Sequence, residues 1–206
     1  MIVSHSNRFI FFAVPKTGTH AVRELLHPFM GEDDWEQQAL FEQKRLPIPE
    51  LARIEHGHLS VRDIKPFLSA DQWSEYYKFG FVRNPFDRFV SICFFLNRKN
   101  PDFHNHSLAW MKSALRRPQF CRRVLVRPQY LQLIDESGEL ALDNIGRYEQ
   151  FQESVDAICS SLSLPQKQLP VKNTSEHNAF DLYYDEELYD LVKAYYSKDL
   201  EMFDYA

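Results

Sequence analysis

A short segment near the start of the sequence, Pro15-Lys16-Thr17-Gly18-Thr19-His20, carries residue types and an order that suit anion binding. It follows the apolar run 8–14 and precedes apolar residues at helical spacing, which predicts a strand, a loop and a helix. In such a turn, backbone N–H groups and the helix dipole face the anion. Lys16 adds a cation, and Gly18 allows close approach. The alternative is a plain turn with a solvated lysine.

A second candidate anion site follows the apolar run 76–83, which predicts another buried strand. Arg83 ends this run, Asn84-Pro85 begins a helix, and Ser91 lies eight residues after Arg83. Ligands gather at the carboxyl ends of strands in doubly wound sheets, so Arg83 and Ser91 are candidates for holding a second anion. The alternative is that Arg83 caps backbone carbonyls and Ser91 packs in the interior.

Between these two segments, His56-Gly57-His58-Leu59-Ser60 holds the best general-base candidates among the eight histidines. Residues 60–63 (SVRD) predict a capping box at the start of a helix, and His58 lies nearer to that start than His56. An imidazole with the ordinary pKa of about 6.5 predicts activity that falls below neutral pH. The alternative is a surface or capping histidine.

The first loop differs from the triphosphatase pattern G-x-x-x-x-G-K-[ST]. Lys16 precedes its glycine, and no Gly-Lys-Ser/Thr occurs in the chain. The hydroxyl of that pattern normally holds magnesium, so a kinase-like phosphotransferase is the weaker alternative. Neither His56 with His58 nor His104 with His106 has Cys or Asp ligands at metal-site spacing, and we expect no metal.

The elements that must position these residues alternate between strand and helix. Apolar runs predict strands over residues 8–14, 76–83 and 144–148. Helical spacing and capping residues predict helices over residues 21–29, 60–68, 85–94, 107–127, 151–162 and 185–200, with an irregular or partly helical excursion over 31–55. This alternation predicts one α/β domain over residues 1–206, a three-layer α/β/α sandwich around a central, mainly parallel sheet.

Composition excludes several classes of protein. The 206 residues carry 24 Lys and Arg against 29 Asp and Glu, a net charge of -5, which disfavours a nucleic-acid binder because phosphate affinity needs a basic surface. The apolar runs are too short for a membrane span, and no secretory signal is evident. Three widely spaced cysteines predict reduced thiols, so we expect a cytoplasmic protein.

Together, the two anion segments resemble those of the sulfotransferases that use 3′-phosphoadenosine 5′-phosphosulfate (PAPS). PKTGT resembles the 5′-phosphosulfate loop of that family, and RNPFDRFVS resembles its 3′-phosphate signature with the same Arg-to-Ser spacing. The C-terminal half resembles the family-2 branch, which includes carbohydrate sulfotransferases. The similar pieces are Arg127-Pro128-Gln129, IGRYEQF from Ile145, LPVKNTS from Leu169, and the closing helix that ends at residues 199–205.

This resemblance implies a P-loop-like nucleotide-binding fold and a PAPS-dependent enzyme that sulfates a hydroxyl of a small-molecule or saccharide acceptor without a metal. The implied PAPS-binding residues are Pro15, Lys16, Thr17, Gly18, Thr19, His20, Arg83 and Ser91. The implied catalytic residues are Lys16, which relieves charge on the bridging oxygen, and His58, because family-2 members have a similar His before a helix. The family usually has Thr or Ser at the position of His20. The imidazole of His20 would either donate a hydrogen bond to the 5′-phosphate or face the acceptor.

Several alternatives stay open at this point. One group of basic residues forms a cluster in the sequence: Lys112, Arg116, Arg117, Arg122, Arg123 and Arg127. This basic cluster would hold an anionic acceptor or the 3′-phosphate, or it would form a solvated helix face. A tyrosine stripe favours packing over a sugar platform; it comprises Tyr183, Tyr184, Tyr189, Tyr195 and Tyr196. A non-catalytic nucleotide-binding module is a rival to the enzyme. The acceptor, the oligomeric state and the choice of base among His56, His58 and His20 are not determined.

Overall fold

A computed structural model describes residues 1–37, 44–54, 56–169 and 179–205, with only the backbone of Lys44 and Arg45. The chain divides into two compact units, each made from two separate pieces of sequence. The sheet unit comprises Met1–Val82 and Tyr130–Pro170, and the helical unit comprises Arg83–Gln129 and Val171–Ala206. Each unit is described by itself below.

A mixed sheet forms the centre of the sheet unit, with six strands among the described residues in the order β4-β3-β1-β2-β5-β6. The strands are β1 (Ile2–Ser4), β2 (Phe9–Phe12), β3 (Trp35–Gln37), β4 (Lys44–Arg45), β5 (Tyr77–Val82) and β6 (Asn144–Arg147). β2, β5 and β6 pair in parallel, as expected, with Phe9 opposite Tyr77 and Gly80 opposite Ile145. β1, β3 and β4 pair antiparallel.

The antiparallel half of the sheet corrects the expectation of a mainly parallel sheet. β1 and β2 are joined by a tight turn, in which Arg8 has a φ of 52°. β3 and β4 lie within residues 31–55, where an irregular or partly helical excursion was predicted. Strands of two or three residues carry too little alternation to be recognised in a sequence, and their pairing with neighbours defines them.

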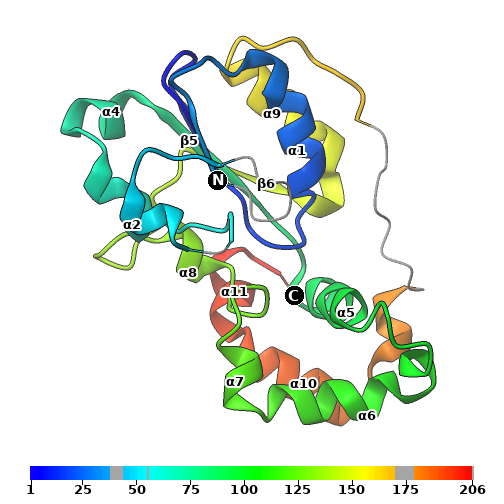
Figure 1. Cartoon of the computed structure of the whole chain (residues 1–206). Helices are drawn as coiled ribbons and strands as arrows, with labels where there is room; N and C mark the ends of the chain where they lie inside the picture. The colour runs from blue at the N-terminus through cyan, green and yellow to red at the C-terminus, as the bar shows by residue number, and fades with distance from the viewer. Residues whose placement is uncertain (38–43, 55, 170–178, 206) are drawn as a thin grey trace. The chain divides into compact units, whose positions relative to one another are not determined.

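Two helices cover one face of this sheet, namely α1 (Thr19–Leu26) and α9 (Phe151–Ser161) (Figure 1). Alternate strand residues point toward them, and the shared core includes Phe9, Phe11, Phe79, Phe81, Val22, Leu25, Val155 and Ile158. Gly80 points to the opposite face, where a Cβ would lie 3.5 Å from Leu133 of α8 (Tyr130–Leu133). The layered α/β expectation is therefore confirmed in its coarse form.

The remaining helices of the sheet unit are short, and they connect the strands. They are η1 (His27–Phe29), α2 (Pro49–Ala52), α3 (Val61–Ile64), η2 (Lys65–Phe67), α4 (Ala70–Glu75) and η3 (Tyr148–Gln150). The predicted capping box at Ser60 is confirmed, because its side chain accepts from the Asp63 N–H and Asp63 accepts from the Ser60 N–H. This cap fixes the start of α3 immediately after the His56–Ser60 segment.

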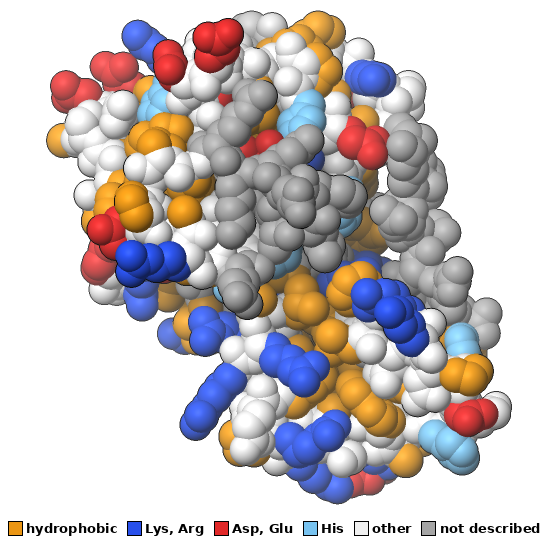
Figure 2. All heavy atoms as spheres, viewed as in Figure 1, with side chains coloured by type: hydrophobic (Ala, Val, Ile, Leu, Met, Phe, Trp, Pro, Cys, Tyr) orange, Lys and Arg blue, Asp and Glu red, His pale blue; other side chains and the backbone are white. Residues whose placement is uncertain are grey.

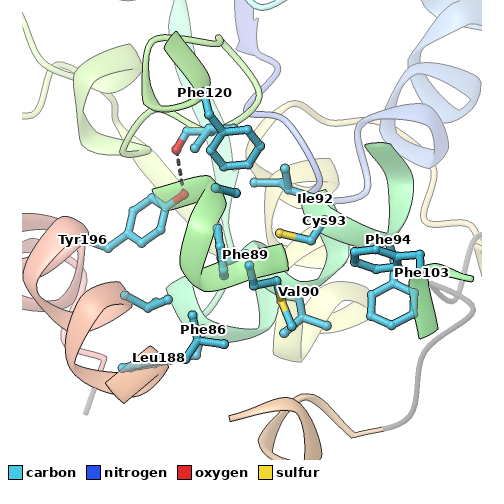
Figure 3. Close-up of a cluster of buried hydrophobic side chains, with 14 residues drawn as sticks. Phe86, Phe89, Val90, Ile92, Cys93, Phe94, Phe103, Phe120, Leu188 and Tyr196 are labelled. Carbon is cyan, nitrogen blue, oxygen red and sulfur yellow. Dashed lines mark hydrogen bonds between the residues drawn. The ribbon is translucent and has the colours of Figure 1, made fainter. Parts of the chain in front are cut away.

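Helices and an aromatic core make up the described part of the helical unit. Its elements are α5 (Pro85–Leu96), α6 (Phe103–Leu115), α7 (Pro118–Cys121), η4 (Phe180–Tyr183), α10 (Glu186–Tyr195) and α11 (Ser197–Met202). Phe86, Phe89, Cys93, Phe94 and Phe103 belong to this core (Figure 3). The expected helix over 107–127 is interrupted, since Arg117 is extended before Pro118, as residues before proline prefer.

The tyrosine stripe contributes to this packing, which is the role that the sequence favoured over a sugar platform. The Tyr196 hydroxyl donates to the Val126 carbonyl at 2.7 Å (Figure 3), and the Tyr184 hydroxyl donates to the Phe86 carbonyl at 2.9 Å. Of the LPVKNTS segment that begins at Leu169, residues 170–175 lie outside the described residues. None of the described helices is long and apolar enough to cross a bilayer.

Candidate functional site

The loop between β2 and α1 has the backbone shape of an anion-binding turn. Lys16 has a φ of 67° and Gly18 a φ of 80°, both in the left-handed region. The Thr17 hydroxyl donates to the Val14 carbonyl at 2.9 Å, which closes the loop on itself. Left-handed residues on either side of Thr17 turn the chain sharply into α1, as anion-binding loops require. The Thr17 side chain therefore shapes the loop.

Gly18 cannot be replaced in this loop without strain. Its positive φ disfavours any side chain, and a Cβ there would lie 2.7 Å from Cε2 of Phe151, the first residue of α9. The Phe151 ring in turn packs on Phe81 of β5 at a centroid distance of 5.1 Å. Both the conformation of the turn and the packing of the sheet core against it therefore require glycine at position 18.

The beginning of α1 fits a negatively charged ligand. Gly18 is its N-cap, and the helix has no side-chain cap hydrogen bond and no acidic residue in its first turn. Helices usually meet their first N–H groups with a capping oxygen, and an anion is the natural substitute. Lys16 is half-buried and Thr19 is buried at this turn, while Pro15, which has no N–H, is buried before it.

His20 is exposed in the first turn of α1. Desolvation and then the positive charges of Arg23 and Lys16 lower the pKa of its imidazole below the ordinary value. A neutral imidazole donates one N–H, so His20 can replace the hydroxyl donor of the resembling family. Its exposure leaves a role toward the acceptor open as well.

His58 is held immediately beside this loop by the backbone of Ala13, the residue that follows β2. Its Nδ1 lies 2.7 Å from the Ala13 carbonyl oxygen, two residues before Pro15. A carbonyl only accepts hydrogen bonds, so Nδ1 carries the hydrogen, and Nε2 of the neutral ring is an acceptor. The tautomer required of a general base is therefore fixed by the backbone of the loop's own strand.

Burial lowers the pKa of His58 to about 3, with smaller contributions from the positive charges of the N-terminal amine, His56 and Arg23. The expectation of an ordinary pKa near 6.5 is wrong for the ligand-free protein. Desolvation disfavours the imidazolium, and no residue pattern near His58 indicated this burial. His58 is consequently neutral throughout the physiological pH range.

The segment that carries His58 is anchored by groups from several elements. Gln132 of α8 donates through Nε2 to the Ala13 carbonyl at 3.0 Å and to the Leu59 carbonyl at 3.1 Å. The Gly57 carbonyl accepts from the Met1 amine at 2.6 Å and from Arg23 Nη2 at 3.5 Å. Sequence reasoning missed Gln132, because nothing local connects residue 132 with residues 13 and 59.

Arg23 belongs to a buried ion pair that supports the same region. Its Nη1 lies 2.7 Å from Glu36 Oε1, and its Nη2 donates to the Gln37 carbonyl at 3.1 Å. Both partners are almost fully buried, so removing one would leave an uncompensated charge. The pair ties α1 to β3, and a Cβ on Gly57 would lie only 2.2 Å from the Gln37 carbonyl oxygen. His56 and His58 lie near each other, with ring centroids 6.1 Å apart.

Arg83 and Ser91 both belong to the helical unit, where α5 aligns them. Arg83 forms a two-bond ion pair with Asp87, Nε to Oδ2 at 2.7 Å and Nη2 to Oδ1 at 2.8 Å. Asp87 and Ser91 are four residues apart on one face of α5, and the Arg83 guanidinium is bonded to Asp87 on that face. Arg83 is 5% exposed and Ser91 is 0% exposed.

The basic cluster is partly neutralised within the helical unit. Lys112 lies 2.5 Å from Asp185 and 2.6 Å from Glu187, and Arg116 also pairs with Glu187. All the arginines of the cluster are exposed, namely Arg116, Arg117, Arg122, Arg123 and Arg127. Blue side chains gather over the region of α6, α7 and α10 on the face shown in Figure 2. No group of three or more metal-ligating side chains occurs among the described residues.

The sheet unit thus combines an uncapped helix start with a neutral imidazole fixed as a proton acceptor, which suits group transfer from an anionic donor. The model of the sulfotransferase family, family 2, matches residues 1–206, and the chain belongs to this family. It is accordingly a transferase whose family moves sulfuryl groups. No curated protein and no solved structure matches it.

Proposed function

We propose that this protein is a PAPS-dependent sulfotransferase that transfers a sulfuryl group to an acceptor hydroxyl. The observation that supports this most is the hydrogen bond from His58 Nδ1 to the Ala13 carbonyl, at 2.7 Å. It presents Nε2 as a proton acceptor beside a loop whose helix lacks a side-chain cap. An anion site and a positioned base are the two requirements of this reaction.

Each part of the donor has proposed partners in the chain. The 5′-phosphosulfate end binds the backbone N–H groups and side chains of residues 15–20, with His20 as a hydrogen-bond donor. The 3′-phosphate binds Arg83 and Ser91. The Arg83–Asp87 ion pair supports this assignment, because it holds the guanidinium in one orientation, and charge-assisted hydrogen bonds to a phosphate depend on that orientation.

In the reaction, the acceptor oxygen forms a bond to sulfur as the bond from sulfur to the bridging oxygen breaks. His58 Nε2 takes the hydroxyl proton, and adenosine 3′,5′-bisphosphate leaves with the bond's electron pair. Lys16 donates to the bridging oxygen, where negative charge develops in the transition state. Lys16 belongs to the loop itself, where its backbone is left-handed.

The low pKa of His58 has a consequence for this mechanism. An imidazole with a pKa of about 3 is neutral but weakly basic. An anionic donor at the adjacent loop favours the imidazolium, so the pKa of His58 rises when the donor binds. Basicity therefore increases only in the complex, when a proton must be accepted.

The acceptor is a hydroxyl of a small molecule or saccharide. The test is an assay of radiolabelled PAPS with a panel of such acceptors, run with magnesium and with a chelator. Label should appear in the acceptor equally under both conditions. A requirement for magnesium would favour phosphoryl-transfer chemistry. Stabilisation by adenosine 3′,5′-bisphosphate with no turnover on any acceptor would favour the non-catalytic nucleotide-binding module.

A further inference from the structure

Buried polar groups of the helical unit hold one irregular segment, residues 125–129, along its whole length. Arg88, which is 1% exposed, donates to the Leu125 carbonyl at 3.0 Å and to the Arg127 carbonyl at 3.2 Å. The Tyr196 hydroxyl donates to the Val126 carbonyl between them. A loop fixed by charged and hydroxyl donors in the interior has one defined path.

The segment ends in Gln129, whose side chain binds both backbone polar groups of Arg83. The Arg83 N–H donates to Gln129 Oε1 at 3.0 Å, and Gln129 Nε2 donates to the Arg83 carbonyl at 2.9 Å. The side-chain amide therefore accepts from the N–H and donates to the carbonyl of one residue, as the backbone of a neighbouring β-strand would. Gln129 is 1% exposed, so water does not compete for these bonds.

Asp199 of α11 fixes Gln129 in turn. Its Oδ2 accepts from the Gln129 backbone N–H at 2.8 Å and lies 3.4 Å from Nε2 of the same residue. Because a carboxylate only accepts, it keeps the amide nitrogen on its own side and leaves Oε1 for the Arg83 N–H. Asp199 is fully buried, which strengthens this orientation.

We propose that Gln129, oriented by Asp199, is a positioning residue for Arg83 and determines selectivity for nucleotides that carry a 3′-phosphate. This inference rests on the proposed function, which assigns the 3′-phosphate to Arg83. Asp87 fixes the far end of the arginine side chain, and Gln129 fixes its backbone. Recognition of phosphate by a guanidinium depends on the direction of its N–H groups, so both ends must be held.

The test compares adenosine 3′,5′-bisphosphate with adenosine 5′-monophosphate by calorimetry on the full chain. Gln129→Met keeps the volume and removes both bonds to Arg83. We expect its affinity for the bisphosphate to fall about tenfold, the scale of losing one or two buried hydrogen bonds, with little change for the monophosphate. Equal weakening of both nucleotides, or no weakening, would overturn the proposal.

Gln132→Met is the matched control, since it also removes a buried amide that bonds the backbone, here by donating to the Ala13 and Leu59 carbonyls of the sheet unit. It should leave the ratio of the two nucleotide affinities at the wild-type value. A change in that ratio as large as that of Gln129→Met would show that any buried amide has this effect, and would overturn the assignment to Gln129.

Gln129→Glu provides a readout that a merely structural role would not produce, and it decides the case if Gln129→Met does not fold. An ionised Glu cannot donate to the Arg83 carbonyl, whereas a protonated Glu offers one donor and one acceptor, like Gln. Its selectivity, relative to wild type at the same pH, should recover as the pH is lowered. No recovery in the folded variant would overturn the proposal. Wild-type protein that does not distinguish the two nucleotides would instead refute the proposed function.

Discussion

The two candidate anion sites are built in different ways. In the sheet unit, the loop before α1 depends on backbone shape: left-handed Lys16 and Gly18, and a helix start without a side-chain cap. In the helical unit, Arg83 depends on side chains, since Asp87 holds its guanidinium and Gln129 holds its backbone. A backbone site tolerates a changed side chain such as His20 but does not tolerate a lost glycine. A side-chain site is sensitive to residues far away in the sequence.

The chemistry is also divided between them in the proposed mechanism. Both candidate catalytic residues, Lys16 and His58, belong to the sheet unit. The helical unit supplies only recognition, through Arg83 and Ser91. Substitutions in the sheet unit should therefore reduce turnover, and substitutions in the helical unit should reduce nucleotide affinity.

The largest effect is expected for His58→Ala. Loss of a general base lowers turnover by about 10²- to 10⁴-fold, while affinity for adenosine 3′,5′-bisphosphate stays nearly unchanged, because the base faces the acceptor. Steady-state kinetics and calorimetry measure the two quantities. His56→Ala is the control and should be milder. If His56→Ala abolishes turnover and His58→Ala does not, the base has been assigned to the wrong histidine; if neither matters, His20 becomes the candidate.

Lys16→Ala should lower kcat by about 10²-fold, the scale of losing one preorganised donor to the developing charge. Since that charge exists only in the transition state, kcat and kcat/KM should fall together. A higher KM with unchanged kcat would make Lys16 a binding residue. It would also contradict the division in which the sheet unit supplies catalysis and the helical unit supplies recognition.

Arg83→Ala should weaken adenosine 3′,5′-bisphosphate by about 10- to 100-fold, as expected for a charge-assisted hydrogen bond. Adenosine 5′-monophosphate should bind nearly as well as to wild type. Calorimetry with both nucleotides measures the difference. If the two nucleotides weakened equally, Arg83 would have a structural role and the assignment of the 3′-phosphate would be lost.

Gly18→Ala should reduce the free energy of unfolding by about 1–2 kcal/mol, because alanine is strained at a φ of 80° and its Cβ would press on Phe151. His20→Thr is the matched change two residues onward and should stay within about 0.5 kcal/mol. Urea unfolding of both variants is the measurement. Similar losses in the two would contradict a loop determined by its backbone.

A further effect concerns pH. Folded His58 has a pKa of about 3, and an unfolded imidazole has about 6.5, so between these values only the unfolded state binds the proton. The free energy of unfolding should therefore fall as the pH drops from about 7 to about 5. His58→Gln removes this contribution, and its unfolding free energy should depend less on pH. Identical slopes for wild type and variant would show that His58 is not buried in its neutral form.

Local sequence determined much of the candidate site. The apolar runs around residues 9–12 and 77–82 specified β2 and β5, because a strand buried on both faces needs continuous apolar residues. Ser60 and Asn84-Pro85 fixed where α3 and α5 begin, since capping depends on residues within one turn. The Lys16-Thr17-Gly18 loop was recognisable because glycine and its neighbours decide the turn locally.

Tertiary structure alone decided the groups that position the chemistry. Gln132 reaches Ala13 across 119 residues, and Gln129 reaches Arg83 across 46. In each pair, the residues near one partner do not indicate the other partner, because a hydrogen bond between distant residues depends on how the chain folds back. The pKa of His58 belongs to this class as well, since desolvation is set by everything packed around the ring. Residue types near the loop thus specified which groups are present, and long-range packing specified their protonation and direction.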